Sequence, residues 1–434
     1  MPSHMPLAGA LLVAVVSLVP AVSGAATEPT TRLVSKNSEE YAADAQSQDP
    51  AVSETGRYIA FTSDANNLSL EDNNAVLNVF VHDRETGRTA LISRTSAGVG
   101  ADGESRNPSI SANGRYVAFQ SAADNLSDRD DDPGRDVFVH DRATGRTELV
   151  SRSTAGAGGD AESLLPSISA DGRFVAFQSD ADNLSGADDN GVTNIFVRDR
   201  EKRKTILVSR TSRGAAADGS SGAPSISANG RYVAFQSQAD NLSGADNDAF
   251  VNIFVRDLER KRTMLVSRTS HGAGANDLSI APSISASGRF VAFTSGADNL
   301  SSADNDAFGN IFVRDLERKK TILISRASDG EAASASSGVP SISASGRYVA
   351  FRSGADNLSN EDNDAFDNVF VRDRKTGRTT LLSRTSNGTA ADGASDTPAL
   401  SGTGRYVAFR SEADNLSGAD NNAFGNIFLR GPLF

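Results

Sequence analysis

One sequence motif occurs seven times at a constant interval of 58 residues. It reads Gly-Arg-(Tyr/Phe)-(Val/Ile)-Ala-Phe and begins at Gly56, Gly114, Gly172, Gly230, Gly288, Gly346 and Gly404. A fixed period of this length indicates a repeat architecture, in which each unit is one supersecondary structure that packs against its neighbours. Both solenoids and propellers have such a period.

Each repeat contains four segments with the composition of β-strands. In the second copy these are residues 108–111, 115–121, 136–140 and 147–152. The second and third segments contain unbroken apolar runs, which are typical of strands that are buried on both faces. Four strands per unit, repeated radially, are the pattern of a β-propeller, and a solenoid is the alternative.

The two ends of the chain favour the propeller. The seventh copy ends after its third strand, residues 426–430, and residues 31–36 match the missing fourth strand in register, two periods before residues 147–152. A ring uses such a strand to complete its last blade and to remove both open sheet edges, whereas a solenoid needs polar caps. The sequence therefore predicts an all-β, seven-bladed β-propeller with four antiparallel strands per blade, closed by the N-terminal strand.

The first 26 residues are expected to form a signal peptide, followed by a single propeller domain over residues 27–434. Residues 7–19 are apolar, and small residues at positions 23–26 offer a cleavage region. An uncleaved membrane anchor is the alternative, which the shortness of the apolar run disfavours. We therefore expect an extracytoplasmic protein, secreted or periplasmic, with no membrane span after cleavage.

Cysteine content and charge exclude several classes of function. The chain has no Cys, which excludes disulfides, thiolate zinc sites and Cys nucleophiles. Its net charge of −12 repels phosphate backbones, so nucleic acid is not an expected partner. Such a surface suits cations or basic protein surfaces better.

Two of the four connections in each repeat are long and acidic, and the other two are tight turns. In an up-and-down blade both long connections lie at the same end, so we expect one acidic face of long loops to carry the function. The Asn-Leu-Ser triplets in these loops, such as that at Asn67, match the glycosylation sequon. Because they recur in every blade, we expect them to stabilise turns.

A set of Asp and Asn residues recurs after each Asn-Leu-Ser triplet and is a candidate calcium site. Oxygen side chains at loop positions 1, 3 and 7 are the ligands that Ca²⁺ prefers. The alternative, which we favour, is that they form Asx turns and cap loop amides. An acid also recurs at position 12, as at Asp83, but five residues of strand would carry it about 16 Å from the loop. The candidate ligands are Asp72, Asn74, Asn78, Asp130, Asp132, Asp136, Asp188, Asn190, Asn194, Asp246, Asp248, Asn252, Asp304, Asp306, Asn310, Asp362, Asp364, Asn368, Asp420, Asn422 and Asn426.

Aromatic and histidine positions in the repeat have two interpretations each. Four loops carry a Phe at one position, where the others carry Val or Gly; these are Phe250, Phe308, Phe366 and Phe424. We expect them to fill gaps between blades, and the alternative is a set of aromatic platforms for sugars. His82 and His140 occupy a position that is Arg in other blades, so we expect an exposed strand face rather than a metal or catalytic site.

Nothing in the sequence indicates catalysis. It contains no Gly-x-Ser-x-Gly elbow and no His-Glu-x-x-His helix, and its acidic loops recur in every blade, whereas a catalytic site combines different groups. We expect a secreted, non-catalytic binding scaffold whose acidic face contacts a protein or cell-envelope component, with Ca²⁺ as an optional ion and no certain cofactor. The alternatives are a multivalent carbohydrate-binding lectin and a metal-assisted hydrolase or lyase. A monomer is expected.

The repeat resembles the TolB-type (WD-repeat-like) β-propeller family of secreted bacterial proteins. The resemblance rests on Pro-Ser-Ile-Ser-Ala-x-Gly-Arg-Tyr-Val-Ala-Phe-x-Ser followed by Ile-Phe-Val-Arg-Asp-x-x-Thr-Gly-x-x-x-Leu-Val-Ser, and it covers residues 31–434. It implies an extracytoplasmic propeller used mainly for protein–protein contacts. TolB itself resembles a six-bladed ring behind an α/β domain, whereas this chain has seven copies, no such domain and a longer second-to-third loop.

Overall fold

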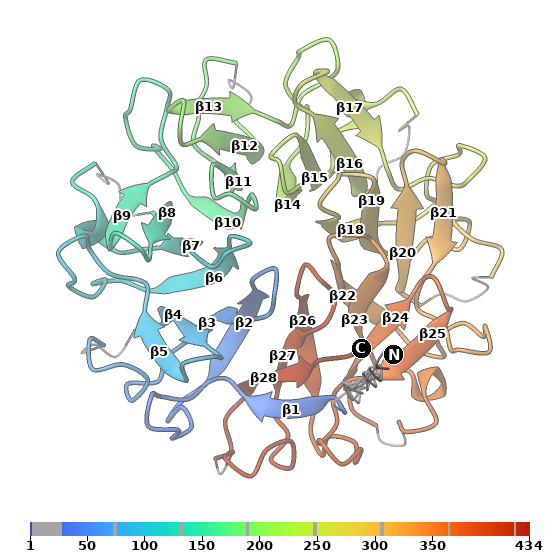
Figure 1. The fold of residues 1–434 in the computed structure, drawn as a ribbon. Coiled ribbons are helices and arrows are strands. Elements are labelled where there is room, and N and C mark those ends of the chain that lie inside the picture. Colours follow the sequence, from blue (N-terminus) through green and yellow to red (C-terminus); the bar gives the residue numbers. More distant parts are fainter. Residues whose placement is uncertain are drawn as a thin grey trace.

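Seven β-sheets are arranged in a ring (Figure 1). Their innermost strands line a cavity at the centre of the ring, which we call the central channel. The computed structural model describes residues 1, 28–72, 76–129, 134–187, 191–245, 250–303, 308–362, 365–420 and 422–434. Each sheet has four antiparallel strands in the order of the chain from the inside outwards, except the last, which includes β1. The predicted seven-bladed β-propeller is confirmed.

The blades contain the following strands, from the innermost to the outermost. Blade 1 has β2 (Ser47–Val52), β3 (Tyr58–Ser63), β4 (Asn78–Asp83) and β5 (Arg88–Leu91). Blade 2 has β6 (Ser105–Ile110), β7 (Tyr116–Ser121), β8 (Asp136–Asp141) and β9 (Arg146–Leu149). Blade 3 has β10 (Ser163–Ile168), β11 (Phe174–Ser179), β12 (Asn194–Asp199) and β13 (Lys204–Leu207). Blade 4 has β14 (Ser221–Ile226), β15 (Tyr232–Ser237), β16 (Asn252–Asp257) and β17 (Arg262–Leu265).

The remaining three blades follow the same plan. Blade 5 has β18 (Ser279–Ile284), β19 (Phe290–Ser295), β20 (Asn310–Asp315) and β21 (Lys320–Leu323). Blade 6 has β22 (Ser337–Ile342), β23 (Tyr348–Ser353), β24 (Asn368–Asp373) and β25 (Arg378–Leu381). Blade 7 has β26 (Ser395–Leu400), β27 (Val407–Ser411), β28 (Asn426–Gly431) and β1 (Thr30–Leu33). Three short 3-10 helices, η1 (Asp124–Leu126), η2 (Asp240–Leu242) and η3 (Asp356–Leu358), follow β7, β15 and β23.

The N-terminal strand closes the ring, as the repeat register predicts. β1 pairs antiparallel with β28 (Figure 1). In this register Thr31 lies opposite Arg430. The hydroxyl of Thr31 also donates a hydrogen bond of 2.5 Å to the carbonyl of Arg384 in blade 6. β1 therefore completes blade 7 and joins it to its neighbour.

The hydrophobic core lies between blades as well as within them. One cluster combines Ala60, Val79 and Val81 of blade 1 with Phe119 and Phe138 of blade 2. Within each blade the two buried phenylalanines of the second and third strands stack, as Phe119 and Phe138 do at 6.0 Å between ring centroids. The apolar runs of these strands are thus buried on both faces, in agreement with their sequence pattern.

The glycine that begins each repeat motif is required by its contact with the preceding blade. Gly114 has a φ of +72°, and a Cβ atom there would lie 2.1 Å from the ring of Tyr58. Gly230 has the same φ and lies equally close to the ring of Phe174. Any side chain at these positions would displace the aromatic ring that packs against it.

The innermost strands begin earlier than predicted and contain an irregularity. β6 starts at Ser105 rather than at Pro108, and its register shifts between Arg106 and Ser109. Asn107, which precedes the proline, has a φ of +50°. A proline is tolerated here because the innermost strand has a free edge along the channel, where no ladder hydrogen bond is lost.

The predicted signal peptide lies almost wholly outside the described residues, since residues 2–27 are not among them. No helix in the described part of the chain is long and apolar enough to cross a membrane. The single propeller domain accounts for all elements from Thr30 to Gly431.

Candidate functional site

The two long loops of each blade meet at one end of the ring and are joined by the Asn-Leu-Ser asparagine. The side chain of Asn125, in the loop after β7, donates a hydrogen bond of 2.9 Å to the carbonyl of Gly100, in the loop after β5. The same bond recurs in all seven repeats, from Asn67, Asn125, Asn183, Asn241, Asn299, Asn357 and Asn415. These asparagines stabilise the loops, as predicted. We call the surface that the two sets of long loops form the loop face.

The last residue of each candidate calcium triplet is the first residue of the third strand of its blade. Its side chain forms hydrogen bonds that fix the end of the preceding loop. Asn252 is fully buried; its amide oxygen accepts a hydrogen bond of 2.6 Å from Ser267, and its amide nitrogen donates to the carbonyl of Phe250. Asn78, Asn194, Asn310, Asn368 and Asn426 make the same pair of contacts. Asp136 replaces Asn in blade 2 and accepts a hydrogen bond of 2.5 Å from Ser151.

The structure describes the whole triplet only in blade 7. The amide nitrogen of Asn426 lies 3.0 Å from a carboxylate oxygen of Asp420 and 3.1 Å from the amide oxygen of Asn422. Burial raises the pKa of Asp420 to about 6, against the hydrogen bonds that it accepts. Asp72 and Asp362 accept the same bond from Asn78 and Asn368.

The calcium site stays a prediction. The candidates Asn74, Asp130, Asp132, Asp188, Asn190, Asp246, Asp248, Asp304, Asp306 and Asp364 lie outside the described residues. Among the residues that are described, no three His, Asp or Glu side chains are grouped so that they could hold a metal ion. The described members of the triplets instead bond to one another and to the protein.

The four loop phenylalanines are not buried between the blades. Phe250, Phe308, Phe366 and Phe424 keep 42%, 42%, 44% and 40% of their surface exposed. The expectation that they fill interblade gaps is therefore wrong, because each residue stays substantially exposed. Their exposure favours the alternative, in which four adjacent blades present aromatic platforms on the loop face.

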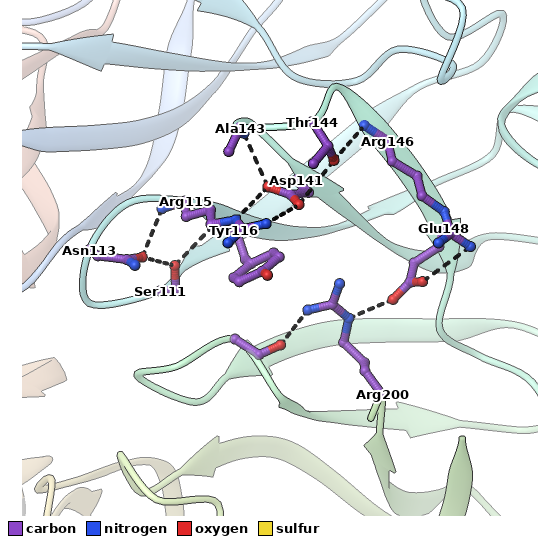
Figure 2. A network of polar contacts seen from close by, with 11 residues as sticks. Ser111, Asn113, Arg115, Tyr116, Asp141, Ala143, Thr144, Arg146, Glu148 and Arg200 are labelled. Atoms are coloured by element: carbon purple, nitrogen blue, oxygen red, sulfur yellow. Dashed lines mark hydrogen bonds and ion pairs between the residues drawn. The ribbon is translucent and has the colours of Figure 1, made fainter. Parts of the chain in front are cut away.

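The opposite face of the ring carries an Arg–Asp pair in each of six blades. In blade 2, Arg115 makes two hydrogen bonds of 2.8 Å to Asp141, and this bidentate contact holds the pKa of Asp141 well below its usual range (Figure 2). Asp83, Asp199, Asp257, Asp315 and Asp373 are bound in the same way by the arginine of the repeat motif. These are the acids at loop position 12, and they act in the hairpins, away from the loop face.

The expectation that His82 and His140 lie on an exposed strand face is wrong. His140 is fully buried and His82 is 3% exposed. The equivalent arginines are also buried, because each reaches across to the preceding blade; Arg198 donates to the carbonyls of Arg152 and Ser153. A position that accepts Arg is thus not exposed when backbone carbonyls satisfy the guanidinium.

The central channel is a second site that the sequence reasoning missed. A cavity of about 310 Å³ is lined by residues of the seven X-Pro pairs in the innermost strands. The residue before proline has a positive φ in every blade, at Asp49, Asn107, Leu165, Ala223, Ala281, Val339 and Thr397. The polar residues among these seven are Thr397, Asp49 and Asn107, from the adjacent blades 7, 1 and 2. Burial raises the pKa of Asp49. The proline that recurs at one position of every repeat is the sequence feature that could have indicated this site.

Comparisons with known proteins support the fold. No protein-family model matches the sequence, and no curated protein is significantly similar to it. Among solved structures, an oligogalacturonate lyase in complex with manganese matches with a TM-score of 0.53 at 11% identity, over 93% of this chain and 90% of that one. The β-propeller domain of the trilobed protease from Pyrococcus furiosus, described as having an open velcro topology, matches with a TM-score of 0.53 at 12% identity, over 89% and 94%. TolB from Acinetobacter baumannii matches with a TM-score of 0.41 at 13% identity, over 78% and 63%.

These similarities correct the functional expectation. The prediction of a non-catalytic scaffold is contradicted, because proteins with this fold include a lyase and the propeller domain of a protease. The two structures with this fold belong to a lyase and to a protease propeller domain that share little sequence with this chain, so the ring alone does not decide between catalysis and binding.

Proposed function

We propose that the loop face binds carbohydrate through the phenylalanines of blades 4 to 7. The observation that carries the proposal is that Phe250, Phe308, Phe366 and Phe424 are each 40–44% exposed at one repeat position. The recurrence of an exposed Phe at one position in four adjacent blades sets these residues apart from singly scattered apolar surface residues, which need no explanation.

Each phenylalanine is held in place by its own blade. The buried asparagine two residues further along bonds to the phenylalanine carbonyl, as Asn310 does to Phe308 at 3.4 Å. The Asn-Leu-Ser segment of the same loop adds an exposed carboxylate, for example Asp298 in the loop of Phe308. An exposed ring and an exposed carboxylate in one loop suit a sugar, whose C–H face packs on an aromatic ring while its hydroxyl groups donate to a carboxylate.

The charge of the chain limits the class of sugar. A net charge of −12 and acidic loops oppose the approach of polyanionic chains such as uronates. Oligogalacturonate, which the structurally similar lyase acts on, is a chain of that kind, so the expected ligand is a neutral glycan. The proposal includes an extracytoplasmic location, where such glycans occur, and Ca²⁺ as an ion that orders the acidic loops.

The repeat provides matched variants to test the proposal. Blades 1 and 3 have Val76 and Val192 at the phenylalanine position, so Phe→Val leaves a residue that the loop already accepts. The wild type is expected to bind one class of neutral glycan on an array, and the fourfold Phe→Val variant to lose that binding without a change of melting temperature. The Val192→Phe variant is expected to bind more strongly. An array without signal for the wild type, or equal binding by the fourfold variant, would contradict the proposal.

A further inference from the structure

The gap between blades 1 and 2 is distinguished by the combination of two residues that face each other, since the gap between blades 7 and 1 also has a histidine, His82, but combines it with Arg32. On the blade 1 side, Ala90 is the smallest residue at its repeat position; the equivalents are Arg32, Glu148, Ile206, Met264, Ile322 and Thr380. On the blade 2 side, His140 replaces the arginine of blades 3 to 7. Both walls of this gap are therefore truncated, and a cavity of about 280 Å³ lies between them.

The hydrogen bonds of His140 determine which of its ring nitrogens carries the proton. The hydroxyl of Thr147 donates to the carbonyl of Arg94 at 2.5 Å, so its oxygen is left to accept. Nδ1 of His140 lies 2.9 Å from that oxygen and is therefore the donor. Burial lowers the pKa of His140 to about 4, so the ring is neutral at pH 7 and Nε2 is an acceptor. In the described part of the chain this fully buried Nε2 has no partner.

Three arginines contribute to the lining of the cavity beside His140. Arg88, Arg94 and Arg142 contribute to its wall, together with Asp83 and Thr86. Arg57 pairs with both Asp83 and Glu85, at 2.8 and 2.7 Å, and Arg94 pairs with Glu71 at 2.6 Å. Among the described residues neither Arg88 nor Arg142 has a carboxylate partner. The local charge is thus positive, in a chain whose net charge is −12.

We propose that this cavity binds inorganic hydrogenphosphate, which keeps one P–OH group at neutral pH. The guanidinium groups of Arg88 and Arg142 donate to its charged oxygens. Its P–OH group donates to Nε2 of His140, which satisfies the buried acceptor. Sulfate has the same shape but no proton at neutral pH, so it leaves Nε2 without a donor and places an anion beside a lone pair.

Calorimetric titration of residues 28–434 with inorganic phosphate and with sulfate at pH 7.5 tests the proposal. Phosphate is expected to bind saturably at one site, and sulfate at least about tenfold more weakly. Equal binding of the two anions would show a basic patch that does not use the histidine, and absence of phosphate binding would exclude the site. Either outcome overturns the proposal.

Two substitutions taken from other blades are expected to fill the cavity without harming the fold. His140→Arg and Ala90→Ile each introduce the residue of blade 3 at the same position, and each is expected to abolish phosphate binding with an unchanged or higher melting temperature. His82→Arg and Thr380→Ile make the same replacements in other gaps and are expected to leave binding intact. Retention of phosphate binding by His140→Arg, or by Ala90→Ile if the first variant is unstable, would overturn the assignment to this gap.

Discussion

The side-chain oxygen of Gln120, in blade 2, accepts a hydrogen bond of 2.8 Å from the backbone N–H of Leu165, in blade 3. Leu165 is the residue before proline in its innermost strand, and its positive φ turns this N–H towards the neighbouring blade. Gln178 and Gln236 make the same contact with Ala223 and Ala281. In blades 3, 4 and 5 the backbone N–H of the residue before proline is therefore satisfied by the preceding blade.

Replacement of Gln120 by Met is expected to destabilise the fold. Met keeps the volume but removes the acceptor, so the N–H of Leu165 is left without its partner, at a cost of about 1–3 kcal/mol. Thr294 occupies the same repeat position, and its buried hydroxyl has no partner among the described residues. Chemical denaturation is expected to show a loss for Gln120→Met and little change for Thr294→Val. Equal effects would contradict the interblade role of the glutamine.

The positive φ before proline predicts a stabilising substitution. Val339 is β-branched, has a φ of +52° and is 40% exposed, so its side chain adds strain and little burial. Val339→Gly is expected to raise the free energy of unfolding by about 1 kcal/mol, since an L-residue in this conformation costs about 1–2 kcal/mol. Asn107→Gly is the control, because Asn tolerates a φ of +50°. A loss of stability for Val339→Gly would show that the strain is relieved elsewhere.

The raised pKa of Asp420 predicts a pH-dependent effect on stability. The carboxyl is protonated in both states below pH 4, and the unfolded chain releases the proton first as the pH rises. The folded protein holds this proton more tightly than the unfolded chain does. The free energy of unfolding therefore falls as the pH rises from 4 to the folded pKa of about 6. Asp420→Asn is expected to raise the melting temperature at pH 7.5 in the presence of a chelator, by an amount equivalent to at most about 3 kcal/mol, and to leave it unchanged at pH 4.

Calcium reverses the sign of that prediction if the triplet in blade 7 is a metal site. Addition of Ca²⁺ would then stabilise the wild type and not Asp420→Asn. A calcium-independent melting temperature in both proteins would return Asp420, Asn422 and Asn426 to a purely structural role.

Removal of the closing strand is expected to open the ring. Deletion of residues 28–36 exposes the edge of β28 and removes the contact of Thr31 with Arg384, so a large fall in melting temperature or aggregation is expected. Arg32→Ala alters an exposed residue of the same strand and serves as the control. Unchanged melting of the truncated chain would contradict the closure.

The architecture could be predicted from the sequence because every blade repeats one pattern without insertion. The match between residues 31–36 and 147–152 was sufficient to predict the pairing of β1 with β28. The innermost strands were less predictable, since Pro108 suggested a strand start, whereas the strand continues through a bulge at Asn107.

The candidate site was predicted less well, because exposure depends on contacts far apart in the sequence. The expectation that Phe308 fills an interblade gap is wrong, because 42% of its surface stays exposed. His140 was read as exposed because Arg occurs at its position, but that arginine is buried against carbonyls 45 and 46 residues before it. The asparagines of the calcium triplets carry chain-stabilising bonds that their spacing alone did not reveal.

The number of glycan sites per chain tests the proposed function most directly. Calorimetric titration with soluble neutral oligosaccharides (β-glucan, α-mannan and chitin fragments) is expected to give four equivalent sites for the ligand that binds, one for each of Phe250, Phe308, Phe366 and Phe424. Phe308→Val is expected to reduce the number to three, with the affinity of the remaining sites unchanged. A stoichiometry that Phe308→Val does not alter, or the absence of binding by every probe, would contradict the account.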